Sequence, residues 1–452
     1  METGAEATNI SKLIVKGGTM YANYSSSNVD QLPATVEFQG GTLWGANMEG
    51  GSGVTNKAKF VVAEGQEGTF YGSYRGTYSG TLTGSGTFNV YTGGVRCYYQ
   101  GDWSAFSGTI NVGKNNRQNK KSYDPNFMYT NKKGLPLAIV NVAANTRFST
   151  EGTAMTVRQL GGEGAIVGTS MWTVKSDEDF TLTTEVGITS ERKDDYDNKI
   201  SVSATPLTKS GSGKMTMIAG RMNGALTVDG GTVAFYNAEL DTLLNGSNAT
   251  TVKGTGRIVG HGLLSSLTVE SDATLMPCGA TDNETTPGTI KVSDKATINS
   301  GATLNIIISP STGTSQLQAK TLTMNGKVVL TLGDDYKPAS GDKFTLWTAS
   351  SSFSGKPTYE LPALPAGLEW DVTALAAKTG VITITGSPLT LGDVNGDGSV
   401  NVVDVTGTIS YILGQKPADF NASVADVNGD GSINVVDVTT IIDIILGKDK
   451  KE

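Results

Sequence analysis

Two copies of one oxygen-rich phrase stand near the end of this chain. The first reads DVNGDGSVNVVD at residues 393–404, and the second reads DVNGDGSINVVD at residues 426–437. Each copy holds three Asp and two Asn residues, although only 17% of the whole chain is charged. A hard cation such as Ca²⁺ takes about six to eight oxygen ligands, which alternate side chains around a tight turn can supply. The repeated phrase therefore predicts two calcium sites.

The spacing within each copy is that of an EF-hand calcium loop. Positions 1, 3, 5, 9 and 12 of such a loop bear side-chain oxygens, position 7 offers a backbone carbonyl, and position 6 is a Gly that permits the sharp turn. An ordinary Asn/Asp turn explains one copy but not two in which every ligand position is kept. Position 12 is Asp here, where the common EF-hand has Glu. The predicted ligands are Asp393, Asn395, Asp397, Ser399, Asn401 and Asp404 in the first loop, and Asp426, Asn428, Asp430, Ser432, Asn434 and Asp437 in the second.

An amphipathic run follows each loop. The runs are VTGTISYILG at residues 405–414 and VTTIIDIILG at residues 438–447. Their apolar residues recur with the spacing of one helix face, which we expect to be the buried face. Those residues are Val405, Ile409, Ile412 and Leu413 in the first run, and Val438, Ile442, Ile445 and Leu446 in the second. The sequence thus predicts two half EF-hands packed face to face, with bound calcium contributing to their folding.

Across residues 391–447 this pattern resembles a type I dockerin. The resemblance implies calcium-dependent docking onto a cohesin through loop positions 10 and 11, which are commonly Ser-Thr. Here those positions hold the pairs Val402 and Val403, and Val435 and Val436. The departure leaves two interpretations open. The valines form a docking surface for a cohesin-like protein, or they pack against the end of the chain's own β-rich body.

The body of the chain, residues 12–390, consists of short β-runs punctuated by Gly. Examples are GGTMYAN at 17–23, GGTVAFYN at 230–237 and TLTMNGKVVLTL at 321–332. The runs alternate with period two and recur every 15 to 25 residues or so, which favours a coil of strands over separate β-sandwiches. The predicted fold is mainly β, with a parallel β-helix (solenoid) over 1–320, an end-cap of the β-helix over 321–385, a linker over 386–390, and a small helical dockerin-type calcium-binding module over 391–452.

Part of this body resembles the autotransporter-associated β-helix repeats. The phrase LTKSGSGKMTM at residues 207–217 carries the resemblance, and GALTVDGGTVAF at 224–235 continues it. Residues 341–355 and 364–372 resemble the closing segment of such passengers. The resemblance implies a parallel β-helix and says almost nothing about activity.

The composition limits the partners of the chain. Its net charge is −8 and no basic stripe stands out, which argues against nucleic acid. No stretch approaches 18 apolar residues, so we expect no transmembrane segment. The start, METGAEATNIS, lacks the basic and apolar parts of a signal peptide, so an exported form of this chain would have been trimmed. We expect Cys97 and Cys278 to be separate thiols, because an elongated coil keeps them apart.

An aromatic group is the candidate for glycan contact. Tyr98, Tyr99 and Trp103 stand close together in the sequence, with further Tyr and Phe residues on either side. Such rings either stack on sugars at the surface of a β-helix or stack on one another between its coils. Both interpretations are open from the sequence.

No catalytic site emerges from the sequence. The single histidine, His261, is expected in a turn between two glycines. The acidic residues of 194–197 are flanked by Arg and Lys and indicate a charged surface loop. Arg75 and Arg96 are basic candidates for a polysaccharide lyase, but no spacing singles them out.

The sequence therefore predicts an exported bacterial surface or secreted β-helix protein. Its expected role is structural or glycan-binding, with a calcium-dependent module for docking onto another protein. The alternative is a polysaccharide-degrading enzyme, either a pectate-lyase-like lyase or a glycoside hydrolase, that carries the same module. Whether the chain is an enzyme stays open, and the missing site favours a binder.

Overall fold

The computed structural model describes eleven stretches of the chain: residues 10–21, 32–44, 55–72, 76–92, 97–114, 126–193, 199–237, 241–279, 284–309, 313–334 and 336–448. The chain divides into two compact units. The first comprises residues 1–333, 346–360 and 376–379, and the second comprises residues 334–345, 361–375 and 380–452. The predicted domain boundaries at 320, 385 and 390 stay predictions.

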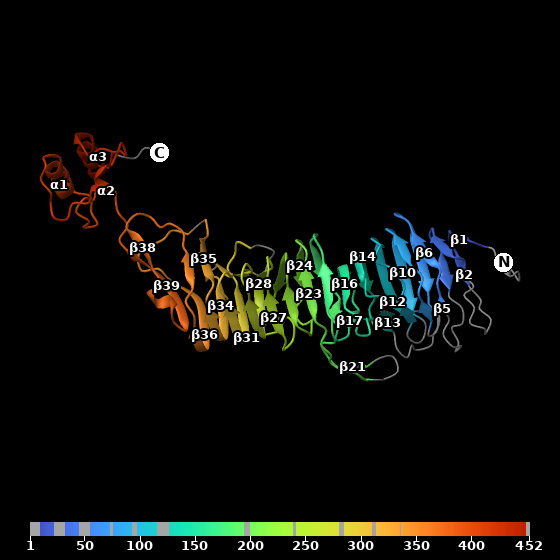
Figure 1. Cartoon of the computed structure of the whole chain (residues 1–452). Helices are drawn as coiled ribbons and strands as arrows, with labels where there is room; N and C mark the ends of the chain where they lie inside the picture. The colour runs from blue at the N-terminus through green and yellow to red at the C-terminus, as the bar shows by residue number, and fades with distance from the viewer. Residues whose placement is uncertain are drawn as a thin grey trace. The chain divides into compact units, whose positions relative to one another are not determined.

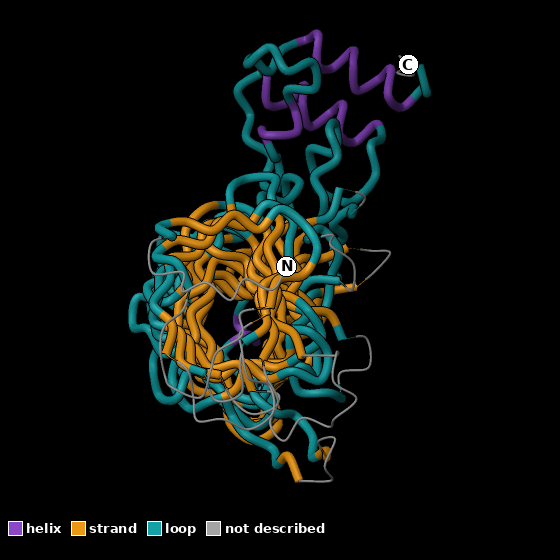
Figure 2. Tube along the Cα trace, turned by 90° about the vertical axis from the view of Figure 1, so that its right-hand side faces the viewer, coloured by secondary structure: helices purple, strands orange, loops and turns teal. Residues whose placement is uncertain are grey.

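The first unit is a stack of parallel coils, and Figure 2 shows its strands surrounding a common axis. One sheet runs along the stack through β2 (Thr19–Tyr21), β4 (Thr42–Trp44), β7 (Glu67–Tyr71), β10 (Thr87–Thr92), β12 (Thr109–Lys114), β14 (Leu135–Val142), β16 (Met155–Gly161), β18 (Trp172–Lys175), β23 (Leu207–Ser210), β25 (Leu226–Val228), β27 (Ala249–Val252), β29 (Ser266–Val269), β31 (Thr289–Ile298), β34 (Gln316–Met324) and β36 (Lys343–Ser354).

Other sheets complete the coils on the remaining sides. At the N-terminal end, one contains β1 (Lys12–Val15), β3 (Thr35–Phe38), β6 (Lys59–Val62) and β9 (Leu82–Gly84). Another contains β5 (Thr55–Asn56), β8 (Thr77–Tyr78), β11 (Cys97–Tyr99), β13 (Asn126–Tyr129), β15 (Arg147–Ser149), β17 (Ala165–Val167) and β20 (Glu185–Val186). The later coils use β19 (Phe180–Leu182), β24 (Lys214–Met217), β26 (Thr232–Tyr236), β28 (Arg257–Leu264), β30 (Thr274–Pro277), β32 (Thr303–Ser309), β35 (Lys327–Leu332) and β37 (Thr358–Glu360).

Short antiparallel pairs interrupt the parallel stack. A hairpin of β21 (Arg192–Lys193) and β22 (Lys199–Ile200) leaves the coils, as Figure 1 shows for β21. The two-residue strand β33 (Gly313–Thr314) pairs with the end of β32. Two isolated antiparallel bridges, Ile188–Ser203 and Cys278–Pro287, also occur, whereas strands of successive coils pair in parallel through the described residues. The predicted parallel β-helix is therefore confirmed.

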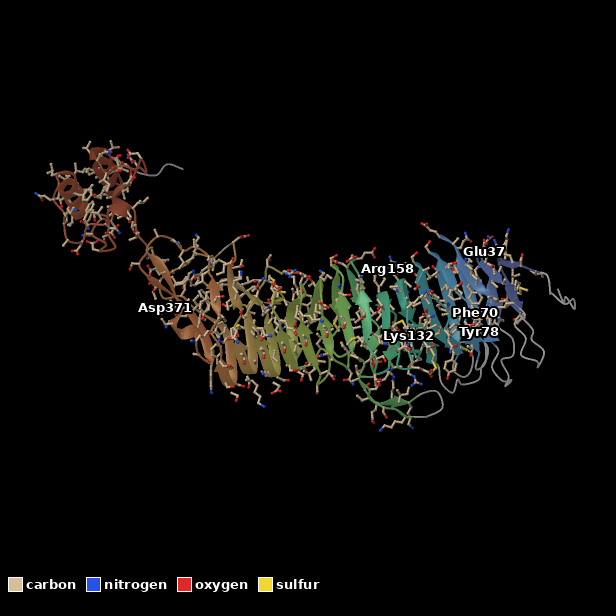
Figure 3. The ribbon with its side chains drawn as sticks, in the orientation of Figure 1. Glu37, Phe70, Tyr78, Lys132, Arg158 and Asp371 are labelled. Atoms are coloured by element: carbon tan, nitrogen blue, oxygen red, sulfur yellow. The ribbon has the colours of Figure 1, made fainter. Side chains whose placement is uncertain are left out.

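Alternation within each strand builds the core of the first unit. The inward residue of one strand lies in register with the inward residue of the next, so that like positions form columns. One such column, buried along its whole length, is Leu43, Phe70, Val90, Val112 and Val142. Figure 3 shows Phe70 near Tyr78 among these strands, and their ring centroids are 4.7 Å apart.

Outward positions of the same sheet form columns as well. The side-chain amide of Asn111 donates to Asn89 Oδ1 at 2.8 Å, and the side-chain amide of Asn141 donates to Asn111 Oδ1 at 2.9 Å. A neighbouring column stacks the rings of Trp44, Tyr71 and Tyr91 at 4.2 and 4.6 Å. Polar and aromatic ladders thus tie successive coils together from outside.

The second unit holds a small β-hairpin and three helices. Strand β38 (Leu368–Asp371) pairs antiparallel with β39 (Thr379–Gly386), and the 3₁₀-helix η1 (Thr373–Leu375) lies between them. The helices are α1 (Val402–Ile412), α2 (Ala422–Ala425) and α3 (Val435–Ile445). Among the described residues no helix is long and apolar enough to cross a membrane.

The buried face of the helices differs from the prediction. Val405 and Val438 are buried as expected, and they join Ile441 in the core of this unit, which also contains Val394, Val424 and Ala425. The other six residues of the predicted buried face are 38% to 73% exposed, and they are Ile409, Ile412, Leu413, Ile442, Ile445 and Leu446. The predicted face was therefore wrong. Asp404, Thr408 and Asp437 line the core instead, because their polar atoms bond back to loop or helix backbone.

Candidate functional site

The first oxygen-rich loop folds around its own carboxylates. Asp393 accepts hydrogen bonds from the backbone amides of Asp397 and Gly398, at 3.1 and 2.8 Å. Asp404 lies twelve positions into the loop and is fully buried. It accepts from the amides of Val394 and Asn395 through Oδ1, at 2.8 and 3.2 Å. Both carboxylates are therefore turned into one loop.

A capping box joins this loop to helix α1. The side chain of Asn401 accepts from the amide of Val403, and Asp404 Oδ2 accepts from the amide of Asn401 at 2.8 Å. Two of the amides that a helix start leaves without partners are satisfied in this way. Asp404 thus serves the loop with one oxygen and the helix with the other.

The second loop repeats the first almost atom for atom. Asp426 accepts from Asp430 and Gly431, at 3.1 and 2.8 Å. Asp437 accepts from Val427 at 2.9 Å, and it forms a capping box with Asn434. Since two separate segments adopt the same arrangement, the loop geometry follows from the repeated phrase itself.

The donor atoms of the loops are those that calcium prefers. Each loop offers carboxylate, amide and backbone oxygens, with neither sulfur nor imidazole nearby in the sequence. Among the described residues no three His, Cys, Asp or Glu side chains converge as they would around a metal. The buried carboxylates of Asp404 and Asp437 fit a calcium ion, and the ligand set stays a prediction.

The four valines of positions 10 and 11 lie at the starts of helices. Val402 and Val403 are the first two residues of α1, while Val435 and Val436 are the first two of α3. Their exposed fractions are 68%, 53%, 67% and 50% in that order. The sequence prediction had missed that the exposed apolar surface continues along both helices. Ile409 and Leu413 lie seven and eleven residues after Val402, so all three share one face of α1.

The structure contradicts the proposed stacking of sugars on Tyr99 and Trp103. Tyr99 is 0% exposed and Trp103 is 1% exposed. Tyr99 stacks on Tyr78 and Phe127, with ring centroids 5.1 and 4.5 Å apart. The internal interpretation therefore holds for both residues. Strand alternation in β11 turns Tyr99 toward the core, and Trp103, which follows that strand, packs edge-to-face against Tyr99 and Phe88. Tyr98 is half-buried, and its contact with glycan stays a prediction.

The described residues do not bring the candidate catalytic residues together in one site. His261 lies within β28 rather than in a turn, and its Nδ1 accepts from the amide of Thr289 at 3.1 Å. Arg75, Arg96 and the acidic residues of 194–197 lie outside the described residues. Cys97 and Cys278 are both buried and are not joined by a disulfide, as the sequence predicted.

Comparison with known proteins separates the two parts of the chain. No curated protein matches it, so the resemblance of the body to autotransporter-associated repeats has no support from a homologue. One protein-family model matches the C-terminal end of the chain, over the loops and helices just described. Residues 391–446 match the family described as the Dockerin type I domain, so this segment of the chain is similar to a type I dockerin.

Proposed function

We propose that this chain is a secreted or cell-surface β-helix protein that docks onto a cohesin through the two valine pairs of its dockerin. Type I dockerins bind calcium and cohesins, and they imply calcium-dependent docking in secreted cellulosome-type proteins. On this proposal each of the two loops holds one Ca²⁺. The β-helix is the part that the docking module delivers, and its role is structural or glycan-binding.

One observation carries the docking proposal, namely the matched exposure of Val402 with Val435 and of Val403 with Val436. Most large apolar residues of a folded protein are buried, so an exposed apolar pair that occurs twice supports an interaction surface. Ile409 and Ile442 extend each pair along its helix and are 41% and 38% exposed. The cohesin surface that contacts these residues is accordingly apolar.

The experiment compares charge substitutions in one half and in both halves. The variants are Val402→Asp with Val403→Asp, Val435→Asp with Val436→Asp, and all four together, each in the full chain with calcium. Binding to a panel of cohesins is measured by calorimetry. A surface-exposed control, Lys416→Asp, keeps the charge change away from the valines.

We expect the fourfold variant to lose binding by a factor of 100 or so, since buried unpaired charges at an interface cost several kcal/mol. Full retention of cohesin binding would place the contact elsewhere. If no cohesin binds the wild-type chain, the valines serve the chain's own packing instead. A second assay incubates the chain with a panel of glycans. A glycan-binding protein retains the glycan uncut, whereas a polysaccharide-degrading enzyme releases products.

A further inference from the structure

A lysine interrupts the apolar core of the first unit. It stands in an inward column of the long sheet that otherwise holds only apolar side chains, one from each coil. The column is Val157, Val174, Lys209, Val228, Val252, Val269, Ile298 and Met324. Every member is fully buried, Lys209 included. Because a buried charge is costly unless it is paired or hydrogen-bonded, the partners of this ammonium group need an account.

Backbone carbonyls hold the ammonium group at a corner of the stack, where the chain leaves the sheet. Lys209 Nζ donates to the carbonyls of Ser210 and Gly211 at 2.8 and 3.0 Å, within its own coil. It also donates to the carbonyl of Ser176, on the preceding coil, at 3.4 Å. An ammonium group has three N–H donors, so each of them has an acceptor here.

The coil that follows approaches the same ammonium group. Gly231 has a φ of +63°, and a Cβ built on it would lie 2.9 Å from Lys209 Nζ. The same Cβ would collide with the carbonyl oxygens of Gly211 and Gly213. A glycine at this position therefore lets the backbone of the third coil close over the lysine. The corners of three successive coils converge on one positive charge.

Two exposed carboxylates fix this corner from the solvent side. Asp177 Oδ1 accepts from the amide and the hydroxyl of Ser212 at 2.8 and 3.0 Å, and Asp179 Oδ1 accepts from the amide of Lys214 at 2.7 Å. Burial lowers the pKa of Lys209, whereas the charges of Asp177 and then Asp179 raise it. Both acids therefore favour the charged form of the lysine beneath them.

The shape of the core does not require a lysine at this place. Val174 and Val228 fill the equivalent positions of the two flanking coils. Replacing a buried ion by an apolar residue of similar size is often neutral or stabilising. A lysine that served only to fill space would accordingly be replaceable by methionine without loss. The carbonyls around Nζ give the charge a different role, since carbonyl oxygens are also what replaces the water around a bound monovalent cation.

We propose that these carbonyls form a cation site which the chain fills with its own Lys209, and that this charge holds the corners of three coils together. The ligand class of the site is an ammonium ion. Truncating the lysine side chain leaves the site open to a small alkylammonium ion from solution. The role falls on the phrase LTKSGSG at residues 207–213, and it is independent of docking and of glycan binding.

The test uses three variants of the full chain. Lys209→Met keeps the apolar stem without the charge, and Lys209→Ala opens the site to propylammonium. Val228→Ala is the matched control, because it opens a cavity in the next coil of the same column and leaves the lysine in place. Urea midpoints are measured with propylammonium chloride, with 1-propanol as the uncharged analogue, and with tetramethylammonium chloride, which has no N–H group.

Hydrogen exchange gives a second measurement at the corner itself. The amide of Gly213 donates to the carbonyl of Ser176 on the preceding coil at 3.1 Å, so its exchange reports opening of the corner. The amide of Asn325, which donates to the carbonyl of Ile298 at 2.8 Å, is the reference at another corner of the stack.

We expect both lysine variants to have lower urea midpoints than the wild type and Gly213 to exchange about tenfold faster or more, since hydrogen bonds to charged groups are the strong ones. Exchange of Asn325 should not change. Propylammonium should raise the midpoint of Lys209→Ala, whereas propanol and tetramethylammonium should not, and none of the three should raise that of Val228→Ala.

A midpoint of Lys209→Met equal to or above that of the wild type would overturn the proposal, because the charge would then be dispensable. Equal rescue of Lys209→Ala by propylammonium and propanol would show that volume and not charge is restored. The wild type provides a test that needs no substitution. A lysine ammonium group buried among carbonyls should exchange its protons slowly enough to give a nitrogen NMR signal at mildly alkaline pH, and the absence of such a signal would also contradict the proposal.

Discussion

The carboxylate of Asp404 accepts a hydrogen bond from the backbone amide of Val394 at 2.8 Å, which ties the last residue of the first loop to its second. Asp437 and Val427 repeat this bond at 2.9 Å in the second loop. Because Asp404 also caps helix α1, loop and helix form one cooperative piece. Whatever binds the loop oxygens therefore acts on the helix starts, where the exposed valines lie.

Replacing Asp404 by Ala should destabilise the dockerin more than any loss of charge at its surface would. The substitution removes the acceptor of three backbone amides from a fully buried position. We expect a cost of about 2–4 kcal/mol, since a buried donor left unsatisfied costs about 1–3 kcal/mol and two of the three amides are only part-buried. Hydrogen exchange of residues 391–446 measures it. Asp419→Ala, at an exposed position, should leave exchange unchanged; equal effects of the two variants would contradict the role given to Asp404.

Removing calcium should loosen the dockerin and spare the β-helix. The two loops hold six Asp residues within a short segment, and on the proposal above bound cations would offset their mutual repulsion. Limited proteolysis with and without a chelator should show cleavage between residues 391 and 448 only after chelation. Magnesium is the matched control, since it prefers smaller octahedral sites. A digestion pattern that chelation leaves unaltered would speak against metal-dependent folding.

Much of this architecture was predictable from the sequence, for identifiable reasons. Strands such as Thr109–Lys114 alternate apolar and polar residues, and the calcium phrase fixes its own loop through Asp404 and Asn401. The buried face of α1 was not predictable in the same way. Its hydrophobic spacing points to Ile409 and Ile412, yet Thr408 takes the buried place by bonding to the carbonyl of Asp404 at 2.9 Å.

The aromatic residues and a cavity of the first unit show a second limit of the sequence. In β11 the side chains alternate, so that Tyr99 points inward and its neighbour Tyr98 is half-buried. The sequence of so short a strand does not tell which of two adjacent side chains faces the core. Arg147 and Arg221 line one cavity of the first unit although 74 positions separate them in the sequence. No spacing rule relates residues from different coils. Only the register of the stack brings them together.

Gly101 should be among the least replaceable positions of the β-helix. A Cβ built on it would collide with the backbone carbonyl of Gly80 on the adjacent coil. Since backbone must move to admit the methyl group, we expect Gly101→Ala to cost about 1–3 kcal/mol. Gly17→Ala is the control, because nothing lies within 4 Å of a Cβ there. Urea midpoints of both variants measure the difference, and equal midpoints would argue against such close approach of the coils.

Acid should remove one small electrostatic contribution in the first unit. Hydrogen bonds from Lys133 and then from Ser104 lower the pKa of Asp102 to about 2. A carboxyl whose folded pKa is depressed stabilises the fold above its unfolded pKa, and the contribution is lost as pH falls from about 4 toward 2. The pair is partly exposed, so we expect no more than about 1 kcal/mol. Urea midpoints of Asp102→Asn and wild type should differ at pH 6 and converge near pH 2; a constant difference would contradict the shift.

The most direct test of the whole account is the affinity of the full chain for a cohesin, measured by calorimetry with calcium and again with a chelator. The account predicts tight binding with calcium and a loss of at least a hundredfold in the chelator, restored when calcium is added back. Binding of equal strength in both conditions would contradict the link between the loops and the docking surface.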